Sequence, residues 1–188
     1  MRAARSLAVV LKALIVLLLL PLCAGAQEAE PEGYRMEHYR GPVPESLSGA
    51  TVIGPEAAYE LWTAGGVGFI DVLPQAPKPA NLPEGTIWRD KPRLSIPGAI
   101  WLPNVGYGAL APQTDGYFRA GLSAATGGDT AHPVLFFCLE ECWMSWNAAK
   151  RALEYGYSHV YWLPEGTDGW AFYDYPLEQV VPREPQPR

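Results

Sequence analysis

Basic residues are few in this chain of 188 residues, which has 14 Lys and Arg against 20 Asp and Glu. Three of the basic residues and none of the acidic ones lie in residues 1–26. The rest of the chain therefore has eleven basic and 20 acidic side chains, a net charge of about −9. Such a surface repels phosphate groups, so the composition argues against binding to nucleic acid or to an anionic membrane.

Histidine and cysteine are equally scarce, with three of each. The histidines are scattered, and no two of them lie at the spacing of metal ligands. Because Cys23 lies within residues 1–26, the remaining cysteines are Cys138 and Cys142. Zinc usually needs four ligands and covalent haem needs a His where Trp143 stands, so no metal or haem site is predicted. Two thiolates could hold a soft ion such as Cu(I), and that alternative stays open.

Long apolar runs are absent except near the N-terminus, from Ala13 to Leu22. Basic residues precede this run and the small residues 24–26 follow it, which is the pattern of a signal peptide cleaved before Gln27. A membrane anchor is the alternative, but a span needs about 20 apolar residues, so no membrane span is predicted after processing. Export predicts a periplasmic protein if the source is a Gram-negative bacterium, and the two remaining cysteines can join there.

Proline and glycine are abundant instead, with 19 of each, while 7 Trp, 10 Tyr and 5 Phe supply material for a core. The chain is therefore predicted to be a compact globule rather than disordered or fibrous. Buried strands alternate with helices, which predicts an α/β fold with a mostly parallel sheet flanked by helices. We expect strands at 67–72, 99–102, 133–137 and 160–163, and helices at 55–64, at 117–124 and from Met144 or Ser145 to 155.

Proline and polar residues divide the chain further. Residues 73–91 contain four prolines, which predicts a long surface insertion, and a turn is expected at 166–170. From Pro176 onward the chain is expected to fray. The predicted segments are a signal peptide (1–26), an extended N-terminal arm laid on the domain (27–49), one folded domain (50–172) and a Pro-rich tail (173–188).

The cysteines lie in the segment that carries the predicted chemistry. Cys138 directly follows the apolar run 133–137, the strongest strand in the sequence, and precedes a helix. The carboxyl ends of parallel strands form the edge where ligands bind, and a loop entering a helix points backbone N–H groups toward its centre. Because these groups stabilise a thiolate, Cys138 is predicted to be an accessible nucleophile.

Four stretches occur in an order and spacing typical of one family. They are Phe69–Val72, Ile96–Pro103, the strand ending in Cys138 with its helix, and Gly156–Tyr161 leading to Trp170. Over roughly residues 50–172 the chain resembles a rhodanese-like domain. The resemblance implies a five-stranded parallel α/β sheet, with Cys138 at the position that holds a persulfide in active sulfurtransferases.

A narrower likeness comes from Cys138, Cys142 and Trp143, followed by Ser145–Arg151. These residues resemble the exported rhodanese-like proteins named for a paired-cysteine–tryptophan motif and associated with pyrroloquinoline quinone (PQQ)-dependent alcohol catabolism. The resemblance implies a periplasmic accessory role, with a quinoprotein dehydrogenase or a cytochrome as partner. It implies a redox or cofactor-handling task and only an indirect link to PQQ.

The loop departs from active rhodaneses, whose loops offer a basic residue after the cysteine and an Arg at the end. Leu139 and Trp143 stand near those places, and Glu140 and Glu141 add negative charge. Two carboxylates repel an anionic donor and disfavour a thiolate, so thiosulfate turnover is predicted to be slow or absent. The Arg that often follows the strand-ending Asp is also missing after Asp71, which predicts that the loop loses this anchor.

The second cysteine leaves two hypotheses for the pair. If the Cα atoms of Cys138 and Cys142 lie within about 7 Å, the pair can cycle between dithiol and disulfide. The alternative is a static structural disulfide, which is common in exported proteins. The first hypothesis predicts thiol chemistry on a small sulfur or thiol substrate, by persulfide transfer or dithiol–disulfide exchange. The second predicts a non-catalytic binding module that docks a dehydrogenase or cytochrome through the loop.

Residues around the cysteines have alternatives of their own. Trp143 and Trp146 either form an aromatic lip for a quinone or a partner, or pack in the core. Lys150 and Arg151 are expected to be solvated. The candidate site comprises Cys138 and Cys142 as catalytic residues, Leu139, Glu140, Glu141, Trp143, Met144 and Ser145 around them, and Asp71 in support through hydrogen bonds.

Overall fold

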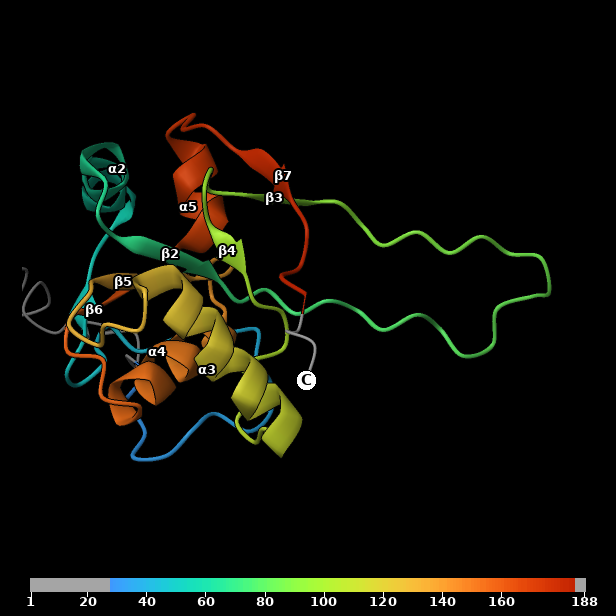
Figure 1. Cartoon of the computed structure of the whole chain (residues 1–188), viewed down its shortest axis with the longest axis horizontal. Helices are drawn as coiled ribbons and strands as arrows, with labels where there is room; N and C mark the ends of the chain where they lie inside the picture. Colours follow the sequence, from blue (N-terminus) through green and yellow to red (C-terminus); the bar gives the residue numbers. More distant parts are fainter. Residues whose placement is uncertain (1–27, 185–188) are drawn as a thin grey trace, which may run out of the picture.

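A parallel β-sheet organises the chain in the computed structural model, which describes residues 28–184 (Figure 1). The predicted signal peptide, residues 1–26, lies outside the described residues. The sheet has the strand order β1-β6-β5-β2-β4, and every neighbouring pair is parallel. Its strands are β1 (Thr51–Val52), β2 (Gly68–Asp71), β4 (Ile100–Trp101), β5 (Val134–Phe137) and β6 (Val160–Leu163).

Helices cover both faces of this sheet (Figure 1). One face packs against α2 (Pro55–Ala64) and α5 (Gly166–Phe172), and the other against α3 (Pro112–Thr126) and α4 (Trp143–Glu154). No helix within residues 28–184 is long and apolar enough to cross a bilayer. The architecture confirms the predicted α/β fold, with the five-stranded parallel sheet that the resemblance to rhodanese-like domains implies.

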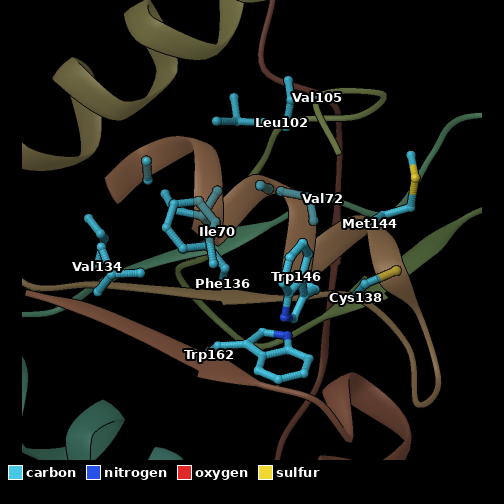
Figure 2. Packing of buried hydrophobic residues seen from close by; sticks show 14 of the residues in the cluster. Ile70, Val72, Leu102, Val105, Val134, Phe136, Cys138, Met144, Trp146 and Trp162 are labelled. Carbon is cyan, nitrogen blue, oxygen red and sulfur yellow. The ribbon is translucent and has the colours of Figure 1, made fainter. Parts of the chain in front are cut away.

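The strand β5 lies at the centre of the sheet because all of its side chains are apolar. Each residue of Val134–Phe137 is fully buried, as expected for a parallel strand covered on both faces. Ile70 of β2 and Trp162 of β6 flank Phe136 in register, and these three side chains belong to the apolar cluster that includes α3 and α4 (Figure 2). Burial of each such side chain contributes about 1.5–3 kcal/mol.

The helix α2 begins and ends where the sequence predicts. Pro55 occupies its first turn, where a missing N–H costs nothing, and Gly65 follows its last residue with a φ of 73°. Ala58 is fully buried in a second cluster, together with Leu135 and Phe137 of β5. Successive side chains of β5 thus point to opposite faces of the sheet and pack against the helices on each face.

Two elements are longer than their local patterns predict. The helix α3 spans 112–126 rather than 117–124, since Pro112 starts it, left-handed Gly127 ends it, and neither Gly116 nor Gly121 interrupts it. The predicted turn at 166–170 is wrong, because these residues form α5. Trp170 of α5 is fully buried against α2, and this packing stabilises a helix whose sequence contains two glycines.

In its described part, residues 173–184, the Pro-rich tail lies on the domain rather than fraying. The strand β7 (Glu178–Val180) pairs antiparallel with β3 (Arg93–Ser95), and the backbone N–H of Arg183 donates to the carbonyl of Trp101 at the edge of the main sheet. Tyr117 of α3 donates to the carbonyl of Arg183, and burial raises the pKa of Tyr117 to about 12. The expectation of fraying is wrong here because open sheet edges offer the tail hydrogen-bond partners.

Residues 73–92 form the long insertion that their prolines predict. They contain no helix or strand and project from the domain between β2 and β3 (Figure 1). The side-chain amide of Gln75 donates to the carboxylate of Asp90, which joins the two limbs of the insertion. Ile87 is 80% exposed, so this insertion has no apolar core of its own.

Candidate functional site

The two cysteines lie between the end of β5 and the beginning of α4. β5 ends at Phe137, and α4 begins at Trp143 with Cys142 as its N-cap residue. The helix thus starts slightly earlier than the predicted Met144 or Ser145. Because β5 lies between the parallel strands β2 and β6, Cys138 lies at the carboxyl edge of the sheet, as the sequence predicts.

A disulfide joins Cys138 to Cys142, and their Cα atoms are 6.2 Å apart. This separation is within the roughly 7 Å that such a bond allows. Only 0% of Cys138 and 2% of Cys142 is exposed, and Cys138 lies in the apolar cluster between the sheet and α4 (Figure 2). The expectation of an accessible thiolate at Cys138 is therefore wrong, because the sulfur is both bonded and covered.

The helix terminus lies at Cys142 rather than at Cys138. The first amides of α4 have no acceptors within the helix, and the positive end of the helix dipole is located there. A thiolate released at Cys142 by reduction is therefore stabilised by that end of the helix. The predicted interaction between a cysteine and a helix N-terminus exists, but it involves the second cysteine.

The loop between the cysteines is acidic and exposed at its tip. Glu140 and Glu141 are exposed, and the backbone N–H of Glu140 donates to the carboxylate of Asp168 at 2.9 Å. Glu141 adopts a left-handed φ of 50°, which turns the chain back toward the helix. Leu139 is half-buried, so the solvated edge of the loop consists of the two carboxylates, and this edge repels anionic donors.

The supporting residue Asp71 acts on the loop through an arginine. Asp71 is fully buried and accepts hydrogen bonds from Arg93 at 2.7 Å and from Ser95 at 2.6 Å. Arg93 in turn donates to the carbonyl of Cys138 at 3.2 Å, and the backbone N–H of Thr167 donates to that carbonyl at 3.1 Å. Residues of β3 and α5 therefore hold the carbonyl of Cys138, at which the loop begins.

The arginine that is absent after Asp71 is replaced by one from a later segment of the chain. Arg93 supplies the anchor from β3, 22 residues beyond Asp71 in the sequence. Sequence reasoning missed Arg93 because it follows a Pro-rich segment that has the composition of an exposed loop. The available signal was indirect: a strand-ending Asp in a buried position needs a cationic or hydrogen-bonding partner.

The N-terminal arm covers the other side of the cysteine loop. The backbone N–H of Gly41 donates to the carbonyl of Glu141 at 3.0 Å, and the backbone N–H of Trp143 donates to the carbonyl of Tyr39 at 2.9 Å. These bonds flank an isolated antiparallel bridge between Arg40 and Cys142. The disulfide is thus closed to solvent by a segment that contains neither helix nor sheet.

The two tryptophans of α4 bind the arm instead of forming a lip. The indole N–H of Trp143 donates to the carbonyl of Pro42 at 3.0 Å, and that of Trp146 donates to the carbonyl of Ser46 at 3.1 Å. Only 1% of Trp143 and 0% of Trp146 is exposed. The core alternative is confirmed, and the aromatic lip for a quinone or partner is wrong.

Further polar groups of α4 hold the chain around it. Asn147, which follows Trp146, accepts from the backbone N–H of Arg35 and donates to its carbonyl, both at 2.9 Å, and so secures a further part of the arm. Arg151 is only 6% exposed and donates to three backbone carbonyls. The prediction of a solvated Arg151 is wrong, because the loop after β4 requires a donor for its carbonyls. These carbonyls belong to Val105, Tyr107 and Gly108.

The remaining loop residues, Met144 and Ser145, are buried in the first turn of α4. The hydroxyl of Ser145 donates to the carbonyl of Cys142 at 3.0 Å and accepts from the indole of Trp162 at 3.0 Å. A Cβ at Gly106 would lie 2.2 Å from the carbonyl oxygen of Met144, so this close approach requires glycine. These residues position the helix start and have no exposed reactive atom.

Between residues 28 and 184, no group of three or more His, Cys, Asp or Glu side chains is arranged to hold a metal ion.

Comparison with known proteins finds no matching protein-family model and no matching curated protein. Among solved structures, the chain is similar to the polysulfide-sulfur transferase homodimer from Wolinella succinogenes, at 18% identity and a TM-score of 0.42, over 70% of this chain and 80% of that one. It is also similar to an uncharacterized protein from Saccharomyces cerevisiae, at 19% identity and a TM-score of 0.40, over 67% and 94%. Neither similarity assigns a function to this chain.

Substituting Arg93 tests the anchor of the loop. Arg93→Met leaves the buried carboxylate of Asp71 without its ion-pair partner, so the free energy of unfolding should fall by about 3–5 kcal/mol. The matched control is Arg119→Ala, which removes the exposed ion pair with Asp115 and should cost at most about 1 kcal/mol. Urea denaturation measures both values. Equal losses in the two variants would contradict the anchoring role.

Proposed function

We propose that the protein is a dithiol–disulfide exchange protein with a rhodanese-like domain, in which Cys138 and Cys142 are the redox pair. One observation carries the proposal: the cysteines close a disulfide within the loop at the carboxyl edge of the sheet, and Cys142 is the N-cap residue of α4. A disulfide next to a helix N-terminus has a leaving thiolate that the helix stabilises. That is the electrostatic requirement for facile exchange.

The reaction oxidises a dithiol of the partner and reduces this disulfide. A partner thiolate attacks one sulfur of the pair, a mixed disulfide forms, and the other sulfur leaves as a thiolate. A second partner thiolate then attacks the mixed disulfide, so the partner leaves with its own disulfide and both cysteines here become thiols. Two electrons pass from the partner to the pair, and two protons accompany them.

Persulfide transfer is less well supported by the site. Glu140 and Glu141 oppose an anionic sulfur donor, and no basic residue occurs in the sequence between Cys138 and Ser145. Arg93 donates a hydrogen bond to the carbonyl of Cys138 at the start of the loop, but its charge is already balanced by Asp71. Arg93 therefore offers thiosulfate no unbalanced positive charge.

A second candidate function is favoured by the burial of the sulfurs. If the pair never opens, the disulfide is structural and the domain is a binding module. Its acidic loop would then dock a quinoprotein dehydrogenase or a cytochrome. The two candidates differ in one measurable property, the reduction potential of the pair in the folded protein.

A redox titration separates the candidates. The native protein is equilibrated with defined ratios of reduced and oxidised dithiothreitol and then quenched with an alkylating agent. We expect reversible two-electron reduction without unfolding, at a midpoint between about −270 and −120 mV, the range of exchange proteins. A pair that resists reduction until below about −300 mV would be structural, which would contradict the exchange proposal and agree with the binding module. A stable adduct of about 32 Da at Cys138 after incubation of the reduced protein with thiosulfate would instead identify persulfide transfer.

Access to the disulfide requires the arm to open, and this step can be tested separately. Gly41→Pro removes the N–H that donates to Glu141, and proline does not adopt the φ of 149° found there. Reduction by dithiothreitol should become about 3–10-fold faster, because a hydrogen bond contributes about 1 kcal/mol. The control is Gly33→Ala in the same arm, since a Cβ at Gly33 meets no atom within 4 Å. Equal rates for both variants would mean that the arm does not limit access.

The proposed setting is the periplasm, in support of PQQ-dependent alcohol oxidation. The support is the N-terminal leader pattern and the motif resemblance of Cys138, Cys142 and Trp143. A strain lacking the gene should grow more slowly on short alcohols and normally on succinate, and complementation with a Cys138→Ser/Cys142→Ser variant should fail to restore growth. Unchanged growth of the deletion strain on alcohols would remove the pathway from the proposal and leave the redox chemistry untouched.

A further inference from the structure

A pocket of about 510 Å³ lies beside the cysteine loop, where the insertion leaves the domain. Both limbs of the insertion, the strand β3, the first turns of α5 and Leu139 of the loop surround it. Figure 1 shows the two limbs diverging from the domain next to β3. The pocket thus lies at the carboxyl edge of the sheet, and its volume is within the range of small-molecule sites in proteins.

The wall of the pocket is mainly apolar. It includes the indoles of Trp88 and Trp101 and the side chains of Leu94, Leu139 and Leu177. The indole N–H of Trp101 already donates to the carbonyl of Leu73 at 2.7 Å, and that of Trp88 donates to Asp90 at 3.0 Å. Since both indole donors are occupied, these rings offer apolar and stacking contacts to a ligand.

The charges around the pocket disfavour an anion. Arg93 is balanced by Asp71, which leaves Lys91 as the cation against the two carboxylates of Asp90 and Asp168. Asp90 also accepts hydrogen bonds from Gln75 and Trp88, and Asp168 accepts one from Glu140, so neither carboxylate is buried without a partner. The local balance of charge is complementary to a neutral molecule and repels an anionic one.

We infer that this pocket binds a small, neutral, ring-containing apolar molecule next to the cysteine loop. The ligand contacts the indoles of Trp88 and Trp101 and the side chain of Leu139, while Asp168, at the pocket's edge, holds the backbone of Glu140. Binding therefore involves the residues that fix the loop on its α5 side, opposite the N-terminal arm. This inference goes beyond the thiol chemistry proposed above and does not rest on it.

The test compares a neutral and an anionic probe with the same ring system. 2-Naphthol and naphthalene-2-sulfonate are titrated into the oxidised full chain by isothermal titration calorimetry, and amide shifts of a ¹⁵N-labelled sample locate the site. We expect saturable binding of 2-naphthol with shifts at Leu94, Leu139 and Thr167. Naphthalene-2-sulfonate should bind at least ~10-fold more weakly because of the two carboxylates.

Two variants block the pocket, and one serves as a control. Leu94→Arg places a charged side chain at a half-exposed position of the wall, and Ala171→Trp fills the pocket from the exposed face of α5. Each should weaken 2-naphthol binding at least ~10-fold. Val181→Arg introduces the same charge as Leu94→Arg at a position that is 76% exposed and outside the pocket wall, and it should bind like the unchanged protein.

Three results would overturn the inference: no saturable binding of 2-naphthol, equal binding of the sulfonate, or unaltered binding in both blocking variants. No thiol reaction enters these measurements. A failed redox titration would therefore leave the pocket standing, and a failed binding test would leave the redox proposal standing.

Discussion

The buried ion pair between Asp71 and Arg93 is the interaction on which the cysteine loop depends. A carboxylate in a fully buried position is costly unless a cation and further donors satisfy it, and Arg93 and Ser95 do so from the neighbouring strand β3. The guanidinium then has donors left for the carbonyl of Cys138 and the hydroxyl of Thr167. The ion pair that neutralises Asp71 at the end of β2 thereby also fixes the carbonyl of Cys138, where the cysteine loop starts.

The loop is held from two sides that differ in kind. On the α5 side, buried donors from Arg93 and Thr167, two residues of regular elements of the domain, hold the carbonyl of Cys138. On the α4 side the contacts are single hydrogen bonds to an arm without regular structure, including those from the indoles of Trp143 and Trp146. Backbone bonds of the second kind open at lower free energy than a buried network, because each contributes only about 1 kcal/mol. In the proposed exchange, the arm is therefore the side from which a partner thiolate would reach the sulfur pair.

Patterns in the sequence correctly predict those elements whose structure depends mainly on residues close by in the sequence. The apolar run of β5 and the Pro55 start of α2 are such cases, and both elements lie where expected. The strands β3 and β7 are three residues each and pair across more than 80 positions, so no periodicity in either segment indicates the other. Arg93 lies in β3 and was missed because the Pro-rich segment before it has the composition of an exposed loop. Arg151 was misjudged because its acceptors lie on a distant loop.

The sequence by itself determined the α/β class, the place of Cys138 at the end of the central strand, the acidic loop and the spacing that lets Cys138 and Cys142 meet. These properties depend on the order of residues along a short segment. Only the tertiary structure decided that the sulfurs are covered, that Cys142 rather than Cys138 is the residue at the helix terminus, and that the tryptophans hold the arm. Exposure and hydrogen bonding depend on which distant segment packs against the loop, and a single segment of sequence carries no information about that partner.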